Sequence, residues 1–118
     1  MEIFPKANKL DFEKAKQLLQ DLPRLKGIEI DLKGREHVTE EESAVLKQLT
    51  PTIANVELAI NSIRDLEIRE IMKYRFINMH PRWAAIRKWG RMTERSVDRK
   101  VEEGTEAVAG TLKLLGIL

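Results

Sequence analysis

The 118-residue chain contains no cysteine, few aromatic side chains (two Trp, one Tyr and three Phe) and no long apolar run. The absence of cysteine excludes disulfide scaffolds, thiolate metal sites and cysteine nucleophiles. No apolar stretch approaches the roughly 18 residues that cross a membrane, and the scattered charges of residues 1–16 are unlike a signal peptide. We therefore expect an intracellular, cytoplasmic protein that does not bind a membrane.

Positive charge is concentrated in one quarter of the chain. The whole sequence has 21 Lys and Arg against 19 Asp and Glu, for a net charge of +2. Residues 75–100 hold eight of the bases and two of the acids, which gives +6, whereas residues 1–74 and 101–118 each sum to −2. A basic segment inside a nearly neutral protein indicates a polyanionic partner that meets one surface.

The composition favours helices over sheets, because 34% of the residues are charged and aromatic residues are scarce. A chain of this length buries one apolar core and is too short for two. We predict an all-α fold, a bundle of five or six helices that ends in a helix-turn-helix. An N-terminal helical region, residues 1–50, and a helix-turn-helix region, residues 51–118, are expected to form one compact unit.

Capping residues and prolines predict the helices of the N-terminal region. Asp11 as N-cap and Pro23 as terminator predict a first helix over 11–22. Residues 24–38 include an alternation of apolar and acidic side chains, which is typical of a half-buried strand. Since no partner strand is visible, we favour an extended connection over a strand that pairs with its copy in a dimer. Thr39 opens a capping box for the next helix.

Two further helices are expected before the basic segment. Thr50 and Pro51 fit the cap and the first position of one of them, in which an apolar side chain recurs every three or four residues. Asp65 is the expected cap of the next helix, which reaches about Ile77. The loop 78–81 then leads into the basic segment.

The basic segment has the pattern of a helix-turn-helix. Residues 82–89 predict a short helix, and Gly90 predicts a tight turn in which glycine takes a positive φ. Thr93 is a strong cap for a second helix. In that helix Val97 and Val101 are expected to point inward, and the charged side chains between them outward.

Several isolated features have ordinary structural explanations. Trp83 and Trp89 lie at helical spacing, so we expect them in the core rather than stacked on DNA. His37 has the spacing of a metal pair with Glu40 and Glu41 but lacks a second histidine, so we expect no metal ligand there. No nucleophile–base pair or phosphate loop is visible, so we expect neither an enzyme nor a cofactor.

The C-terminal segment combines small and apolar residues. Gly104, Ala107 and Gly110 recur every three residues, so either a helix breaks there or close packing against another helix requires small side chains. The apolar ending, Leu112 to Leu118, is expected to fold back on the N-terminal helices. The alternative is a homodimer seam.

Residues 56–100 resemble region 4 of sigma-70-type factors and related phage regulators. The resemblance rests on Trp83-Ala84-Ala85-Ile86 and Thr93-Glu94-Arg95-Ser96-Val97-Asp98-Arg99, which match the two helices of the family's helix-turn-helix. The whole chain looks most like the small phage and prophage activators called ArpU-like or RinA-like. It departs from them at Arg87, where the family has a small residue, and at Gly90, which is shifted by one position.

The resemblance implies a sequence-specific regulator of phage or prophage transcription in the bacterial cytoplasm. Its expected partners are double-stranded DNA, RNA polymerase and a second copy of the chain. In such motifs base-edge contacts give specificity and phosphate contacts give affinity. We expect base contacts from Glu94, Arg95, Ser96 and Arg99, and phosphate contacts from Arg82, Arg87, Lys88, Arg91, Thr93 and Lys100.

Two rival functions are compatible with the same sequence. A small terminase subunit for DNA packaging also carries a helix-turn-helix, but it assembles into a ring of several copies. A helical adaptor that acts on RNA polymerase would use its helical face and would not need Arg95 or Arg99.

Overall fold

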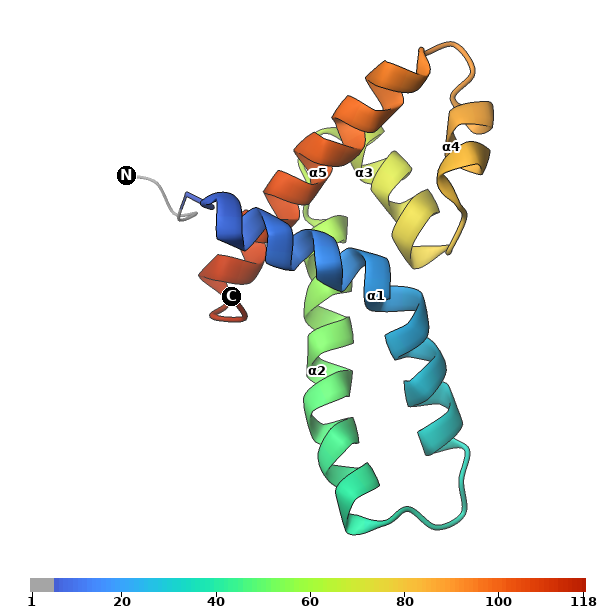
Figure 1. The fold of residues 1–118 in the computed structure, drawn as a ribbon, viewed down its shortest axis with the longest axis vertical. Helices are drawn as coiled ribbons and strands as arrows, with labels where there is room; N and C mark the ends of the chain where they lie inside the picture. The colour runs from blue at the N-terminus through green and yellow to red at the C-terminus, as the bar shows by residue number, and fades with distance from the viewer. Residues whose placement is uncertain (1–5) are drawn as a thin grey trace.

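The structure is a computed structural model that describes residues 6–118, and all regular structure in that range is helical. Three long helices cross one another, and two short ones cover one end (Figure 1). The smallest extent is 21 Å, about two helix diameters, so the helices lie in two layers. The predicted all-α fold of five helices is confirmed over the described residues. The elements are α1 (Lys9–Lys33), α2 (Glu40–Asn61), α3 (Leu66–Met72), the π-helix η1 (Lys73–Ile77), α4 (Arg82–Lys88) and α5 (Glu94–Leu114).

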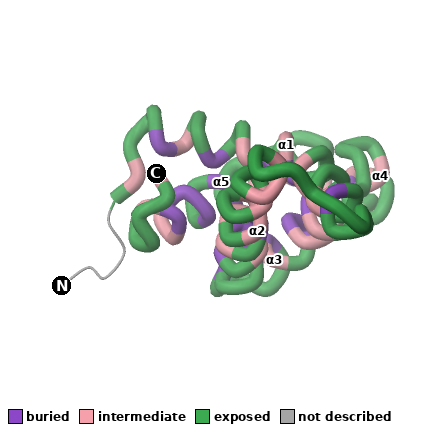
Figure 2. Tube along the Cα trace, turned by 90° about the horizontal axis from the view of Figure 1, so that it is seen from below, coloured by how far each residue is buried: buried purple, intermediate pink, exposed green. Residues whose placement is uncertain are grey.

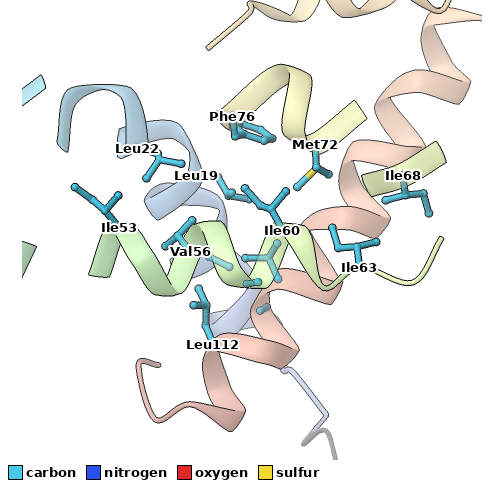
Figure 3. Packing of buried hydrophobic residues seen from close by; sticks show 14 residues of the cluster. Leu19, Leu22, Ile53, Val56, Ile60, Ile63, Ile68, Met72, Phe76 and Leu112 are labelled. Carbon is cyan, nitrogen blue, oxygen red and sulfur yellow. The ribbon is translucent and has the colours of Figure 1, made fainter. Parts of the chain in front are cut away.

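One apolar core lies where α1, α2 and α5 meet, with α3 and η1 closing one side (Figure 3). Residues from both sides of position 50 belong to it, so the two predicted regions share a single core. The one buried hydroxyl, that of Thr105, donates to the Val101 carbonyl at 2.8 Å, so its burial leaves no donor unpaired. The core residues are Ala15, Leu19, Leu22, Ile53, Val56, Ala59, Ile60, Ile63, Ile68, Met72, Phe76, Val108, Ala109 and Leu112.

Helix α5 continues through its small residues and packs closely against α3. A Cβ atom at Gly104 would lie 2.5 Å from Met72 Cγ and 3.1 Å from Ile68 Cγ2, so only glycine permits this approach. Leu112 is fully buried in the core, and α5 contacts both α1 and α2. The predicted fold-back of the C-terminal segment on the N-terminal helices is confirmed at Leu112 and Leu118, whereas Leu114, Leu115 and Ile117 are exposed. The helix does not break at the small residues, and Gly104 is the one that allows close helix packing, since Ala107 is exposed.

The start of α1 is tied to the end of α5. Asn8, not the predicted Asp11, is the N-cap: Asn8 Oδ1 accepts from the Asp11 N–H at 2.8 Å, and Asp11 Oδ2 accepts from the Asn8 N–H at 3.0 Å. Asp11 Oδ2 also accepts from Lys113 Nζ at 2.8 Å. The hydrogen bond from Lys113, followed by that from the Asn8 backbone, lowers the pKa of Asp11 below its usual value. One carboxylate thus joins the first and last turns of the bundle.

Pro23 does not end α1, which continues to Lys33. The predicted end at residue 22 is wrong, and so is the extended connection or strand expected over 24–38. Proline removes the hydrogen bond to the Leu19 carbonyl, and Figure 1 shows α1 changing direction part-way along. Leu25, just beyond the proline, packs against the core. Tertiary packing of an apolar face outweighs the local preference.

Beyond Pro23, α1 runs beside α2 as a hairpin that projects from the rest of the molecule (Figure 1). The alternating residues there are helical, and Leu32 is buried while Ile28 and Ile30 are exposed. The connection over 34–39 is exposed along its length, as Figure 2 shows from the hairpin's tip. The alternation of apolar and acidic residues therefore wrongly predicted the two-residue period of a strand in a segment that is helical.

Helix α2 spans both of the helices that were predicted on either side of Thr50 and Pro51, and Pro51 lies inside it. The predicted cap is confirmed: Thr39 Oγ1 accepts from the Glu42 N–H at 3.1 Å, and Glu42 Oε1 accepts from the Thr39 N–H at 3.3 Å. The break expected between Thr50 and Pro51 does not occur. The apolar stripe that follows the proline is buried in the core, which holds the helix together across it.

Asp65 caps α3 as predicted, and its Oδ1 accepts from the Ile68 N–H at 2.9 Å. The helix expected to reach Ile77 does so as two segments, α3 and then the π-helix η1. At its end the Asn78 N–H donates to the Lys73 carbonyl at 2.8 Å, the five-residue spacing of a π-turn.

We expect Gly104→Ala and Gly27→Ala to change stability in opposite directions. By helix propensity alone, each change stabilises by about 1 kcal/mol. At Gly27 the new Cβ meets no atom within 4 Å, so the gain remains. At Gly104 it overlaps the fully buried Met72, and overpacking costs about 1–3 kcal/mol. In urea denaturation followed by circular dichroism, Gly27→Ala should raise the midpoint and Gly104→Ala should lower it. Equal midpoints for the two variants would contradict this close approach.

Candidate nucleic-acid interface

Helices α4 and α5, with the turn between them, carry all the residues predicted to contact DNA. Thr93 caps α5 as predicted, because its Oγ1 accepts from the Ser96 N–H at 3.1 Å. The turn is closed by the Trp89 N–H, which donates to the Ala85 carbonyl at 2.9 Å, and by the Met92 N–H, which donates to the Trp89 carbonyl at 2.9 Å. Two short helical segments are thus joined by a compact connection.

Gly90 does not take the positive φ that was predicted for the turn. Among the described residues, positive φ occurs at Met79 (60°) and Gly116 (75°). The hydrogen bonds of the turn form without a residue in the left-handed region, so the turn does not require a glycine. A Cβ at Gly90 would lie 3.3 Å from the Arg87 carbonyl oxygen, a tight contact.

Helix α4 is seated on η1 and α5 by few buried residues. Ala85 and Ile71 of α3 are fully buried, and Val97 of α5 is almost fully buried. All three lie outside the main core cluster. Trp83, two residues from Ala85, lies on the other side of α4 and is 65% exposed. The prediction that Trp83 belongs to the core is therefore wrong. Trp89 is half-buried.

An aromatic cluster connects the end of α4 to η1. Tyr74 stacks on His80 with ring centroids 3.9 Å apart and meets the edge of Trp89 at 5.4 Å. Lys88 Nζ lies 5.0 Å from the Tyr74 ring centroid and 5.6 Å from that of Trp89. A cation over an aromatic face is attracted by the ring quadrupole, so Lys88 is held beside this cluster. Trp89 therefore positions α4 rather than filling the main core.

Two of the predicted phosphate-binding residues lie in ion pairs. Arg82 forms a two-pronged pair with Asp98, with Nε to Oδ1 and Nη2 to Oδ2 both 2.8 Å. The Lys100 Nζ lies 3.3 Å from Glu67 Oε1. The hydrogen bond from Arg82 lowers the pKa of Asp98 and correspondingly raises that of Arg82. The Arg82–Asp98 pair links the first turn of α4 to α5 and fixes their relative position.

Four of the arginines predicted to contact DNA are unpaired on the surface of α4, the turn and α5. Within residues 6–118 none of them has a salt bridge or a side-chain hydrogen bond, and all are exposed. Arg95 and Arg99 are four residues apart and therefore share one face of α5. Glu94 is exposed on the first turn, and Ser96 is half-buried and hydrogen-bonded to Thr93. The free arginines are Arg87, Arg91, Arg95 and Arg99.

Sequence reasoning did not single out Arg75, which is half-buried in η1. Its Nε is buried and has no hydrogen-bond partner among the described residues. Burial lowers the pKa of Arg75, with the charge of Arg82 acting in the same direction. The one available signal was its place beside the apolar residues Met72, Phe76 and Ile77.

The described residues offer no metal site and no membrane span. Between residues 6 and 118 no three His, Asp or Glu side chains gather closely enough to hold a metal ion. In the same range no helix combines the length and the apolar character that crossing a bilayer requires.

We expect Arg82→Gln to raise the pKa of Asp98 toward its usual value, because the lost hydrogen bond is the main cause of the lowering. Arg75→Gln serves as the control, since Arg75 acts on Asp98 through its charge alone. A carboxylate whose pKa is lowered on folding stabilises the fold at pH values above its pKa in the unfolded chain. This contribution is lost as the pH falls through its pKa in the folded chain. Arg82→Gln should therefore also make the stability of the fold less dependent on pH in the acid range. Carboxyl-carbon NMR titration measures Asp98 directly; an unmoved pKa would show that the pair does not persist in solution.

Comparisons with known proteins give no information about the role of this surface. No protein-family model, curated protein or solved structure matches the chain. The free arginines of α4, the turn and α5 are therefore the feature of this surface that points to a function.

Proposed function

We propose that the protein is a sequence-specific DNA-binding regulator of phage or prophage transcription, acting in the bacterial cytoplasm, and that α4 and α5 form its helix-turn-helix. One observation carries this proposal: Arg87, Arg91, Arg95 and Arg99 are exposed and unpaired on α4, the turn and the first half of α5. Free arginines are the side chains best suited to phosphate oxygens and to guanine edges.

The burial pattern of α5 supports its use as a recognition helix. Val97 is buried beneath the first half of the helix, and continuous burial begins only at Gly104. The upper half of α5 therefore extends beyond the core, beside α4 (Figure 1). A major groove admits an α-helix that presents one free face in this way. The second half of α5 anchors the first half to the bundle.

Charge placement supports separate roles within the surface. Arg95 and Arg99 share one face of α5 and are the proposed base-reading residues, with Glu94 as an acceptor for a cytosine amino group. Arg87 and Arg91 lie before the N-terminus of α5, where backbone N–H groups and the helix dipole favour a phosphate. Arg82, held by Asp98, orients α4 and contributes less to phosphate binding than the sequence predicted.

We expect Arg95→Ala and Arg99→Ala each to weaken binding to the cognate site by about 1–3 kcal/mol and to relax specificity. Lys88→Ala should weaken binding similarly on all sequences, because phosphate contacts carry no sequence information. Lys47→Ala, an exposed cation on the far hairpin, is the matched control and should change nothing. Fluorescence anisotropy with fragments of the encoding genome, at two salt concentrations, measures all four variants.

The same titration distinguishes the rival functions when mass is measured by light scattering. A monomer or dimer that binds one fragment tightly, with steep salt dependence, fits the regulator. A ring of several copies would favour DNA packaging. Full binding of the cognate fragment by Arg95→Ala would overturn the recognition-helix assignment. Absence of DNA binding at low salt would leave only the adaptor.

A further inference from the structure

A cavity of about 430 Å³ lies between the first half of α1, η1, α4 and α5. Phe12 and Leu19 of α1, Phe76 of η1 and Val101 of α5 supply its apolar lining. Leu19 and Phe76 are core residues that lie close together (Figure 3), so this part of the wall is continuous with the core. The volume falls within the range of about 300–1,000 Å³ that is usual for small-molecule sites.

Arg75, which is half-buried, brings a positive charge to this cavity, whose lining includes both apolar and polar side chains. Its Nε is buried without a hydrogen-bond partner, and no carboxylate among residues 6–118 pairs with its guanidinium. The guanidinium carbon lies 4.8 Å from the Phe76 ring centroid, a contact that leaves the N–H donor unused. A buried donor without an acceptor is costly, and a charged one is costlier. An anion in the cavity would supply the counter-charge that the Arg75 guanidinium lacks.

The charges around the cavity favour an anion as that acceptor. Lys16, Arg75 and Arg82 contribute three positive charges, against two negative charges from Asp98 and Glu102. Arg82 and Asp98 neutralise each other in their two-pronged pair. Two cations, Lys16 of α1 and Arg75 of η1, then remain against the single carboxylate of Glu102.

The geometry points to a binding site for a small organic anion that carries a ring or short hydrocarbon chain. Its carboxylate or phosphate head pairs with the guanidinium of Arg75, and Lys16 contributes a second positive charge. Its apolar part lies against Leu19, Phe76 and Val101. Such a ligand would bridge α1 to α5. The inference stands on the cavity and on Arg75, and it does not depend on the proposed DNA binding.

The test uses 2-naphthoate as the probe and its neutral analogue 2-naphthalenemethanol, titrated by calorimetry into the full chain and into three variants. One 2-naphthoate should bind per chain, and the neutral analogue should bind much more weakly. Arg75→Gln should weaken 2-naphthoate binding at least about tenfold, since a charge-assisted hydrogen bond is lost. Lys16→Gln should weaken it less. Lys73→Gln removes the same charge from the same element but lies outside the cavity, so it should leave the affinity unchanged.

NMR shift mapping keeps the inference falsifiable if Arg75→Gln disturbs folding. Addition of 2-naphthoate should shift the methyl and ring signals of Leu19, Phe76 and Val101. Shifts confined to other parts of the chain would overturn the site. So would equal affinity for the neutral analogue, unchanged affinity in a folded Arg75→Gln chain, or no binding at millimolar probe.

Discussion

The close approach of α5 to α3 at Gly104 is the contact on which the rest of the architecture depends. Without a side chain at this position, α5 meets Met72 and Ile68 at van der Waals distance, and its following residues reach the core between α1 and α2. Protein interiors are close-packed, so one missing side chain decides how near two helices can lie. The second half of α5 is thereby fixed, and its first half is left free beyond the core.

That division of α5 explains how one helix serves both packing and surface chemistry. Apart from Val97, its buried residues lie after position 103, while its free arginines lie before position 100. The Arg82–Asp98 pair and the aromatic cluster around Tyr74 then hold α4 beside the free half. A rigid scaffold with exposed cations at one end is what the proposed DNA binding requires. The cavity at Arg75 lies beneath the same scaffold, where α1 approaches η1.

Sequence patterns failed where tertiary packing outweighed a local preference. Pro23 and Pro51 predict helix boundaries because proline removes a backbone donor, yet both lie inside helices whose apolar residues continue into the core on each side. The alternation around Ile28 and Ile30 predicted extended backbone, but on a projecting hairpin these side chains are simply exposed. Trp83 was expected in the core by its spacing, and α4 is too short and too peripheral to bury it.

The sequence by itself determined the features that depend on neighbours within one helical turn. The caps at Thr39, Asp65 and Thr93 form as expected because their hydrogen bonds reach only three residues along the chain. The all-helical class and the basic block over 75–100 follow from composition and order alone. Only the tertiary structure decided which of those cations are free: Arg82 meets an acid sixteen residues away, Lys100 pairs with Glu67, and Arg75 lines a cavity without forming an ion pair. Such pairings depend on how distant helices pack, and no local pattern records that.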